Sequence, residues 1–121
     1  MAVIRQPIEH LSRNEQEAIS AFLGRLERQY PGRIHQAILF GSKARGDSHP
    51  ESDVDILLIA NGEDWRFDHA VSDLAADVSL KYDVLINPHV IGRERWERMG
   101  RERFSLYENV LREGVPLTPP R

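Results

Sequence analysis

The stretch AILFGSKARGDSHPESDVDILLIA, residues 37–60, decides the fold. It holds the end of one apolar segment, IHQAILF at 34–40, and the whole of a second, DVDILLIA at 53–60. Short apolar runs bounded by turn residues are typical of buried β-strands. Gly41, Ser42 and a polar loop join the two segments. The sequence leaves open whether the two strands pair like a hairpin or connect through a short crossover.

Helices are predicted on both sides of this stretch. Ser12 and Glu15 match the S-x-x-E capping box, and apolar residues then recur at helical spacing. The predicted elements outside 34–60 are a helix from 12 to about 30, a helix from 64 to about 80, a strand at 82–87 that ends before Pro88, a helix from about 91 that breaks near Gly100, a helix from about 104 to 113, and the tail VPLTPPR. The order α-β-β-α-β-α predicts one domain, residues 1–121, of the α/β class and α+β type, with helices packed on a small sheet.

The composition is that of a globular domain without covalent cross-links. Of the 121 residues, 40% are hydrophobic and 29% are charged, and there are no cysteines. The lack of cysteine excludes disulfides, thiolate metal sites and cysteine nucleophiles. The N-terminus has no long apolar run, and the segment ILLIA is too short to span a bilayer, so we expect no membrane partner and a cytoplasmic location. The net charge of −3 is weak evidence against nucleic acid as the main partner.

Two carboxylates stand at the start of the second apolar segment. Because alternate residues of a strand face the same side, Asp53 and Asp55 share one face while Val54 points into the core. Two half-buried carboxylates repel each other unless a cation lies between them. Mg²⁺ prefers oxygen ligands, typically one or two carboxylates with phosphate oxygens and water. The pair therefore predicts a magnesium site.

Asp83 is the candidate third ligand. It lies at the start of the predicted strand YDVLIN. If this strand lies beside residues 53–60 with Asp83 on the same face, three carboxylates converge. Such a triad can hold two metal ions about 3.5–4 Å apart, the arrangement used in phosphoryl transfer. Asp83 is also a candidate to accept the proton of an attacking hydroxyl.

The Gly41-Ser42 pair is a candidate phosphate site. Glycine lets the backbone approach a phosphate without a side-chain clash. Ser42 offers a hydroxyl and an N–H at the start of a possible short helix, SKARG, and helix N-termini attract anions. One segment would thus contact phosphates and the next would hold the metal, and a nucleoside triphosphate with magnesium needs both.

Together these residues resemble the signature of the polymerase-β-like nucleotidyltransferase superfamily, which is Gly-Ser, ten intervening residues and Asp-x-Asp. Here the count is Gly41-Ser42, residues 43–52 and Asp53-Val54-Asp55. The resemblance covers about residues 34–117 and is specific mainly at 37–60. The short length and the segment YENVLREGVPL are similar to minimal nucleotidyltransferases, which are often encoded beside a small helical HEPN-type partner.

The resemblance implies a mixed sheet flanked by helices, two Mg²⁺ ions on Asp53, Asp55 and Asp83, and triphosphate contacts from Gly41 and Ser42. It implies transfer of a nucleoside monophosphate from a nucleotide to an acceptor hydroxyl with release of pyrophosphate, and we expect AMP transferred from ATP, although no residue in the sequence identifies the base. In the best-understood minimal members the acceptor is a tyrosine of a HEPN-type toxin, and the transferase acts as the antitoxin. A HEPN-type toxin is therefore the expected partner, in a hetero-oligomer.

Lys43 and Arg45 complete the candidate nucleotide contacts. Lys43 stands where many members of the superfamily carry arginine, and it keeps the charge without the bidentate fork. Arg45 can meet a phosphate or pair with a carboxylate and brace the loop. The arginine-rich segment 93–103 is either a solvated helix face or a docking surface, and the histidines show no metal-ligand spacing.

Two other functions are compatible with the sequence. The protein could neutralise its partner by occupancy without catalysis, or it could transfer the nucleotide to a small molecule.

Overall fold

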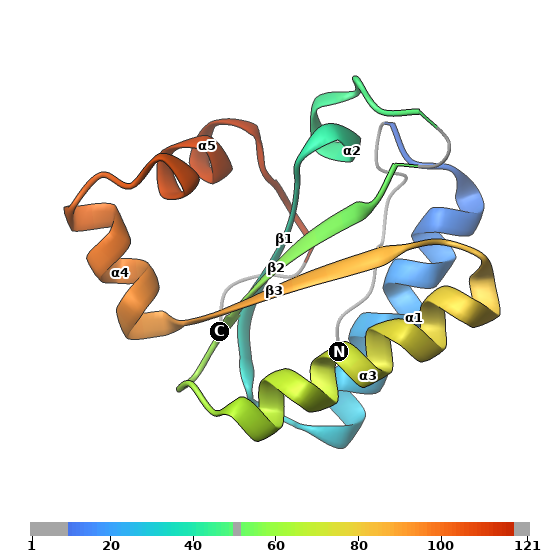
Figure 1. The fold of residues 1–121 in the computed structure, drawn as a ribbon, viewed down its shortest axis with the longest axis horizontal. Helices are drawn as coiled ribbons and strands as arrows, with labels where there is room; N and C mark the ends of the chain where they lie inside the picture. The colour runs from blue at the N-terminus through green and yellow to red at the C-terminus, as the bar shows by residue number, and fades with distance from the viewer. Residues whose placement is uncertain (1–9, 50–51, 118–121) are drawn as a thin grey trace.

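The structure, a computed structural model, describes residues 10–49 and 52–117. Its elements in chain order are α1 (Arg13–Gln29), β1 (Ile34–Phe40), α2 (Ser42–Arg45), β2 (Val54–Ala60), α3 (Trp65–Tyr82), β3 (Ile86–Gly92), α4 (Arg93–Arg101), α5 (Ser105–Glu113) and β4 (Val115–Pro116). Figure 1 shows α1 and α3 on one side of the strands and α4 and α5 on the other. The prediction of a small mixed sheet flanked by helices is confirmed.

The four strands form one sheet in the order β3-β2-β1-β4. Strands β1 and β2 are antiparallel, with Phe40 opposite Asp55, so the polar loop joins a directly paired couple rather than a crossover. Strands β2 and β3 are parallel, and α3 is the crossover helix between them. Part of the predicted tail forms β4, a short antiparallel edge strand beside β1.

Helix α1 begins as its capping box predicts. The Ser12 hydroxyl accepts a hydrogen bond from the N–H of Glu15 at 3.0 Å. The N–H of Ser12 donates to the Glu15 carboxylate at 2.8 Å. Two backbone N–H groups at the helix start thus have partners.

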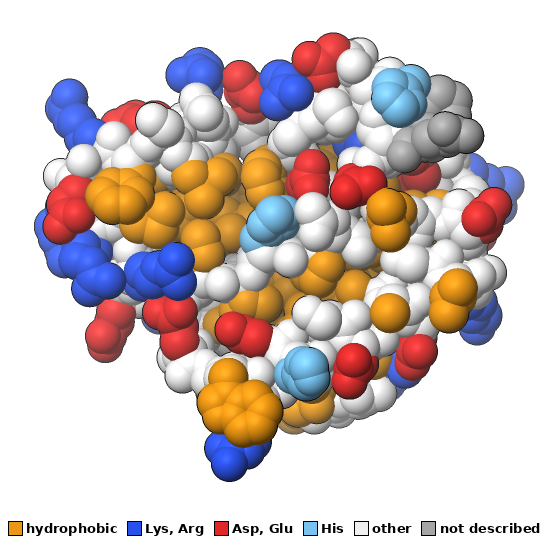
Figure 2. Space-filling view, viewed as in Figure 1, with side chains coloured by type: hydrophobic (Ala, Val, Ile, Leu, Met, Phe, Trp, Pro, Cys, Tyr) orange, Lys and Arg blue, Asp and Glu red, His pale blue; other side chains and the backbone are white. Residues whose placement is uncertain are grey.

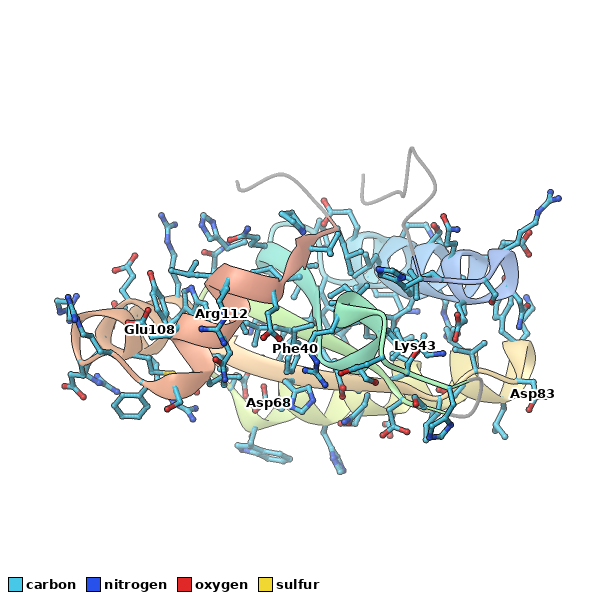
Figure 3. All side chains as sticks on the ribbon, turned by 90° about the horizontal axis from the view of Figure 1, so that it is seen from above. Phe40, Lys43, Asp68, Asp83, Glu108 and Arg112 are labelled. Carbon is cyan, nitrogen blue, oxygen red and sulfur yellow. The ribbon has the colours of Figure 1, made fainter. Side chains whose placement is uncertain are left out.

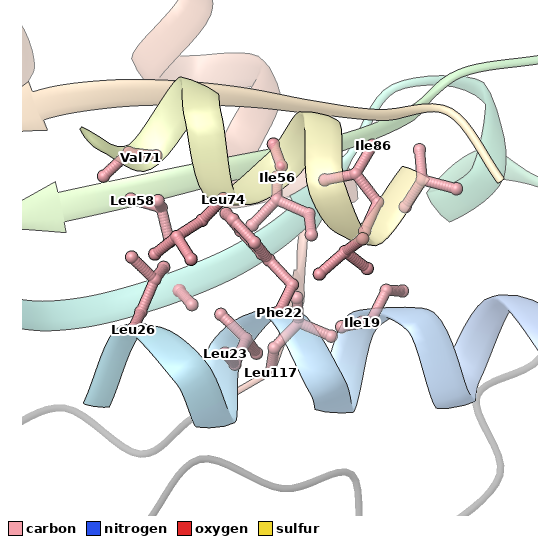
Figure 4. Packing of buried hydrophobic residues seen from close by; sticks show 14 of the residues in the cluster. Ile19, Phe22, Leu23, Leu26, Ile56, Leu58, Val71, Leu74, Ile86 and Leu117 are labelled. Carbon is pink, nitrogen blue, oxygen red and sulfur yellow. The ribbon is translucent and has the colours of Figure 1, made fainter. Parts of the chain in front are cut away.

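The larger core lies between α1, α3 and one face of the sheet. Figure 4 shows Phe22 of α1 packed near Leu74 of α3 and near β2. Every second residue of β2 belongs to this core, and all of them are fully buried: Val54, Ile56, Leu58 and Ala60. Because side chains alternate along a strand, Asp55 points to the other face of the sheet.

A smaller core lies on that other face, under α4 and α5. Its buried members are Ile38, Leu57, Ile59, Ile91, Trp96, Met99 and Val110. Trp96 of α4 packs on Tyr107 of α5, with ring centroids 4.6 Å apart. Helices α4 and α5 cover Leu57 but not the start of β2, where the Asp55 side chain is 24% exposed. The end of this face around Asp55 and His89 is therefore partly exposed, and we call it the open half of the sheet face.

The third strand differs from its prediction. It runs over Ile86–Gly92 rather than 82–87, and it continues through Pro88. Proline is tolerated there because β3 is an edge strand, where a missing N–H can face solvent. Asp83, predicted at the strand start, instead ends α3 as its C-cap, with φ of 54°. Within residues 10–49 and 52–117, every helix is too short or too polar to span a bilayer.

Candidate functional site

The open half of the sheet face carries the motif residues. Figure 2 shows hydrophobic side chains gathered in a hollow on this side of the molecule, with a histidine and acidic side chains beside it. Phe40 ends β1, and its ring lies 5.1 Å from the ring of His89 of β3 in an edge-to-face contact. His89 in turn lies 3.4 Å from the Asp55 carboxylate. Three neighbouring strands thus supply side chains to one surface.

The Asp-x-Asp motif has the predicted alternation at its second position. Val54 is fully buried in the larger core, and Asp55 faces the opposite side of the sheet. Asp53 directly precedes β2 and is half-buried. The site therefore has two carboxylates at the start of a rigid central strand, which limits their movement.

Gly41 packs directly against Asp55. It has φ of 78°, and a Cβ at this position would lie 2.5 Å from Oδ2 of Asp55. Only glycine satisfies both the backbone angle and the close approach. The Gly41 carbonyl accepts hydrogen bonds from the N–H groups of Ala44 and Arg45 of α2, and Ser42 is the first residue of that helix. The structure therefore brings the Gly-Ser turn beside the Asp55 carboxylate.

Strand β3 supplies two polar side chains to the same carboxylate. Asn87 is the register partner of Asp55, and its Nδ2 donates to Oδ1 of Asp55 at 2.9 Å. The His89 Nε2 lies 3.4 Å from the same oxygen. One oxygen of Asp55 is thus held by β3, while the other faces the Gly-Ser turn.

Asp83 is separate from this cluster. It caps α3, which packs on the opposite face of the sheet from Asp55. Figure 3 shows Asp83 at one end of the molecule, beyond Lys43. It lines a different cavity, shared with Glu15 and Lys43. In the described part of the chain no three His, Cys, Asp or Glu side chains lie close enough to hold a metal ion, so the expected convergence of three carboxylates does not form.

Lys43 forms its ion pair with α1 and not with the carboxylates of the open face. Its side chain is buried, and Nζ lies 2.6 Å from Oε2 of Glu15 and donates to the carbonyl of His49 at 3.2 Å. Burial works to raise the pKa of Glu15, but hydrogen bonds from Lys43 and Ser12 and the charge of Lys43 outweigh it, so the pKa lies below its ordinary value. This buried ion pair fixes the motif loop on the start of α1. The phosphate contact expected of Lys43 stays a prediction.

Arg45 pairs with two carboxylates. Its Nε lies 3.1 Å from Asp47, and its Nη1 lies 3.5 Å from Glu113 at the end of α5. These ion pairs are partly exposed, so each contributes little to stability. They are the bracing arrangement that the sequence left open for Arg45. The phosphate contact expected of Arg45 stays a prediction.

The residues at the open face fit a divalent cation shared with phosphate. Asp53 and Asp55 provide the carboxylate oxygens that Mg²⁺ prefers. Gly41 has no Cβ, and a Cβ at this position would lie 2.5 Å from Oδ2 of Asp55. Oδ2 therefore lies directly beside the backbone of the Gly-Ser turn. A phosphate held at the turn and a cation held by these carboxylates would therefore be neighbours.

Asn87 and His89 are the site residues that sequence reasoning missed. The predicted strand ended at Pro88, so the pattern Asn87-x-His89 was divided between a strand end and a loop. A strand placed at 86–92 would have put both on one face by simple alternation. The spacing between histidines in the sequence could not indicate this contact, because the partner of His89 is an aspartate on another strand.

Comparison with known proteins gives consistent similarities. The family model described as "Nucleotidyltransferase domain" matches residues 19–114. A Methanocaldococcus jannaschii protein named "Putative protein adenylyltransferase MJ0604" is 44% identical over 101 residues, which cover 84% of this chain and 95% of that protein. A second protein of the same organism, named "Putative protein adenylyltransferase MJ0141", is 38% identical over 73 residues, covering 60% of this chain and 74% of that protein.

Solved structures share the fold. A structure described as a "putative minimal nucleotidyltransferase" has a TM-score of 0.55 and 26% identity, and the match covers 90% of this chain and 99% of that one. A crystal structure of a toxin–antitoxin with AMP-PNP contains a chain with a TM-score of 0.56 and 22% identity, covering 83% of this chain and 73% of that one. At that identity the second likeness concerns the fold alone.

Proposed function

This chain belongs to the nucleotidyltransferase domain family and is an enzyme of that class, and we propose that it transfers AMP from ATP, with Mg²⁺, to a hydroxyl group of a partner protein. The observation that carries the proposal is the packing of Asp55 against Gly41, which joins the candidate metal ligand to the candidate phosphate turn. The relatives named as protein adenylyltransferases support AMP and a protein acceptor.

The proposed reaction is a substitution at the α-phosphorus of ATP. The acceptor oxygen forms a new bond to this phosphorus, and the bond from it to the oxygen that bridges to the β-phosphate breaks. Pyrophosphate leaves, and the hydroxyl proton passes to a base or to water. Asp53 and Asp55 would hold Mg²⁺, and Gly41 and Ser42 would hold the phosphates. When bound, the ion supplies polarisation of the phosphate oxygens and neutralises charge on the leaving group.

The chain's own residues orient the reactants. Gly41 allows a phosphate to approach the backbone next to Asp55, and β3 and the turn hold the Asp55 carboxylate between them. Positioning of this kind accounts for much of phosphoryl-transfer catalysis. The open half of the sheet face, beside the hollow under α4 and α5, leaves room for an acceptor from another protein.

The proposed acceptor is a tyrosine hydroxyl of a HEPN-type toxin, and the proposed role is that of the antitoxin, acting in the cytoplasm. The support is a likeness of fold to a chain of a toxin–antitoxin with AMP-PNP. Transfer would neutralise the toxin by covalent modification.

Radiolabelled ATP tests this function. The protein is incubated with Mg²⁺, the protein encoded beside it, and ATP labelled at the α- or the γ-phosphate. We expect label on the partner from α-labelled ATP and none from γ-labelled ATP, because pyrophosphate leaves. Asp55→Ala and Asp53→Ala should each lower labelling by about 100-fold or more, since removing even outer contacts of a metal site costs about 10- to 100-fold.

Asp73→Ala is the matched control, because Asp73 is an exposed carboxylate on α3. It should label the partner like the wild type. If folded protein leaves the partner unlabelled, the proposed transfer is wrong. If Asp53→Ala still binds and neutralises the partner, neutralisation occurs by occupancy instead.

A further inference from the structure

The parallel pairing of β2 and β3 brings an amide and an imidazole to Asp55. Asn87 is the direct register partner of Asp55, and its Nδ2 lies 2.9 Å from Oδ1. His89 lies two residues further along β3, on the same face, with Nε2 3.4 Å from the same oxygen. The two β3 side chains that contact Asp55, Asn87 and His89, therefore carry no negative charge.

The other oxygen of Asp55 is directed away from β3. Oδ2 lies where it would contact a Cβ at Gly41, at 2.5 Å. Because Oδ1 is held by the Asn87 amide, the carboxylate is fixed with Oδ2 toward the Gly-Ser turn. A cation bound by Oδ2 would therefore stand on the side where phosphates are proposed to bind.

A third carboxylate is missing from the described part of this cluster. Asp83 caps α3 in the layer on the other face of the sheet. The N–H of Val54 donates to the carbonyl of Leu85, the residue just before β3, and the hydrophobic side chain of Leu85 is 57% exposed. Among the described residues of this cluster, the carboxylates are those of Asp53 and Asp55. Coulomb attraction for a divalent cation is correspondingly weaker than at three carboxylates.

We propose that Asn87 and His89 stand in the place of a third carboxylate, so that the nucleotide-free protein binds divalent cations weakly and tight binding requires the phosphates of the nucleotide. Cation affinity in proteins depends strongly on the number of charged ligands. The phosphate oxygens of ATP would supply the negative charge that the protein lacks. This order keeps the site free of tightly bound metal until its substrate arrives. The proposal rests on the proposed function for the identity of the nucleotide.

Mn²⁺ is the probe, because its electron paramagnetic resonance signal measures the free ion directly. The purified full chain is titrated without nucleotide and without a partner protein. We expect a dissociation constant of about 10⁻⁴ M or weaker, the range of sites with few charged ligands. Asn87→Asp adds a carboxylate beside Asp55 and should tighten Mn²⁺ binding by about 10-fold or more, because each added charged ligand strengthens the site.

Asn61→Asp is the matched control. Asn61 directly follows β2 at the far end of the strand and donates to the carbonyl of Gly32 at 2.8 Å, so a carboxylate there should leave Mn²⁺ affinity unchanged. His89→Asp is the second variant, because it also places a carboxylate near Asp55. It serves if circular dichroism shows that Asn87→Asp does not fold.

Three outcomes would overturn the proposal. The first is micromolar Mn²⁺ binding by the wild-type protein without nucleotide. The second is an unchanged affinity in folded Asn87→Asp and His89→Asp. The third is weaker Mn²⁺ binding in Asp83→Ala, which would place that carboxylate in the site. None of these measurements involves AMP transfer, so a failure of the proposed function is seen separately, as an absence of labelling with α-labelled ATP.

Discussion

Gly41 shows how one residue type can link two halves of a site. Its positive φ and its contact with Oδ2 of Asp55 each exclude a side chain. In Gly41→Ala, the new methyl group must displace either the turn or the carboxylate. A displacement of about 1 Å in a catalytic geometry can cost about 100-fold in rate. We expect a loss of that size in the initial rate of partner labelling with α-labelled ATP.

Gly32→Ala separates the clash from the backbone strain. Gly32 has φ of 77°, nearly that of Gly41, but a Cβ there would have no heavy atom within 4 Å. Both positions have a positive φ, which costs a residue with a side chain about 1–3 kcal/mol, and only the Gly41 variant disturbs Asp55. Equal rates in the two variants would show that the contact with Asp55 is unimportant for transfer.

The motif residues could be predicted one by one, but their partners could not. The spacing of Gly41-Ser42 and Asp53-Val54-Asp55 is local, and the alternation that buries Val54 follows from strand geometry. The contact of Asn87 with Asp55 spans 32 positions. It depends on the register of two strands that α3 connects, and no local pattern encodes that register.

The element that anchors the motif loop is α1. The Glu15 carboxylate belongs to the capping box and also forms an ion pair with Lys43 of α2. Removing one partner of a buried ion pair leaves an uncompensated charge, which costs about 3–5 kcal/mol. Glu15→Gln should therefore lower the free energy of unfolding by about 3 kcal/mol at neutral pH, as measured by urea denaturation.

Acidic pH should reduce the difference in the free energy of unfolding between the wild type and Glu15→Gln. The pKa of Glu15 is lower in the folded protein than its ordinary value of 4.5, so the ionised carboxylate stabilises the fold above that value. The contribution is lost as the pH falls from about 4.5 through the lowered folded-state pKa. The stability gap between wild type and Glu15→Gln should thus shrink on acidification.

Glu17→Gln is the control at the same scale. Glu17 pairs with Arg13 on the exposed face of α1, where the two side chains are 54% and 94% exposed. Exposed pairs contribute less than about 1 kcal/mol. A cost for Glu15→Gln no larger than this, or a gap that widens on acidification, would contradict the anchoring role.

At the scale of the whole molecule, the second core makes the sheet two-sided. Trp96 closes that core from α4 and is only 8% exposed, whereas Trp65 at the start of α3 is 67% exposed. Truncating a buried aromatic residue costs about 3–5 kcal/mol. Trp96→Ala should destabilise the protein by that amount in urea denaturation followed by circular dichroism.

Trp65→Ala provides the comparison, since surface substitutions usually change stability by about 0.5 kcal/mol or less. Its contact with Arg66 is exposed and adds little. Similar stabilities for the two variants would mean that α4 and α5 contribute little to the fold. That result would also mean that α4 and α5 are not a fixed boundary of the open half of the sheet face.

The sequence by itself determined the order of the longer elements, the capped start of α1, the strands around the Gly-Ser turn, and the carboxylates at the start of β2. These features depend on residues close together in the chain, where periodicity and turn chemistry act directly. Only the tertiary structure decided that Pro88 lies within β3, that Asp83 caps α3, and that Lys43 pairs with Glu15 of α1. Each depends on which strand is at the edge of the sheet and which helix lies beneath the loop. Burial and strand pairing decide those neighbours, and they act between residues far apart in the sequence.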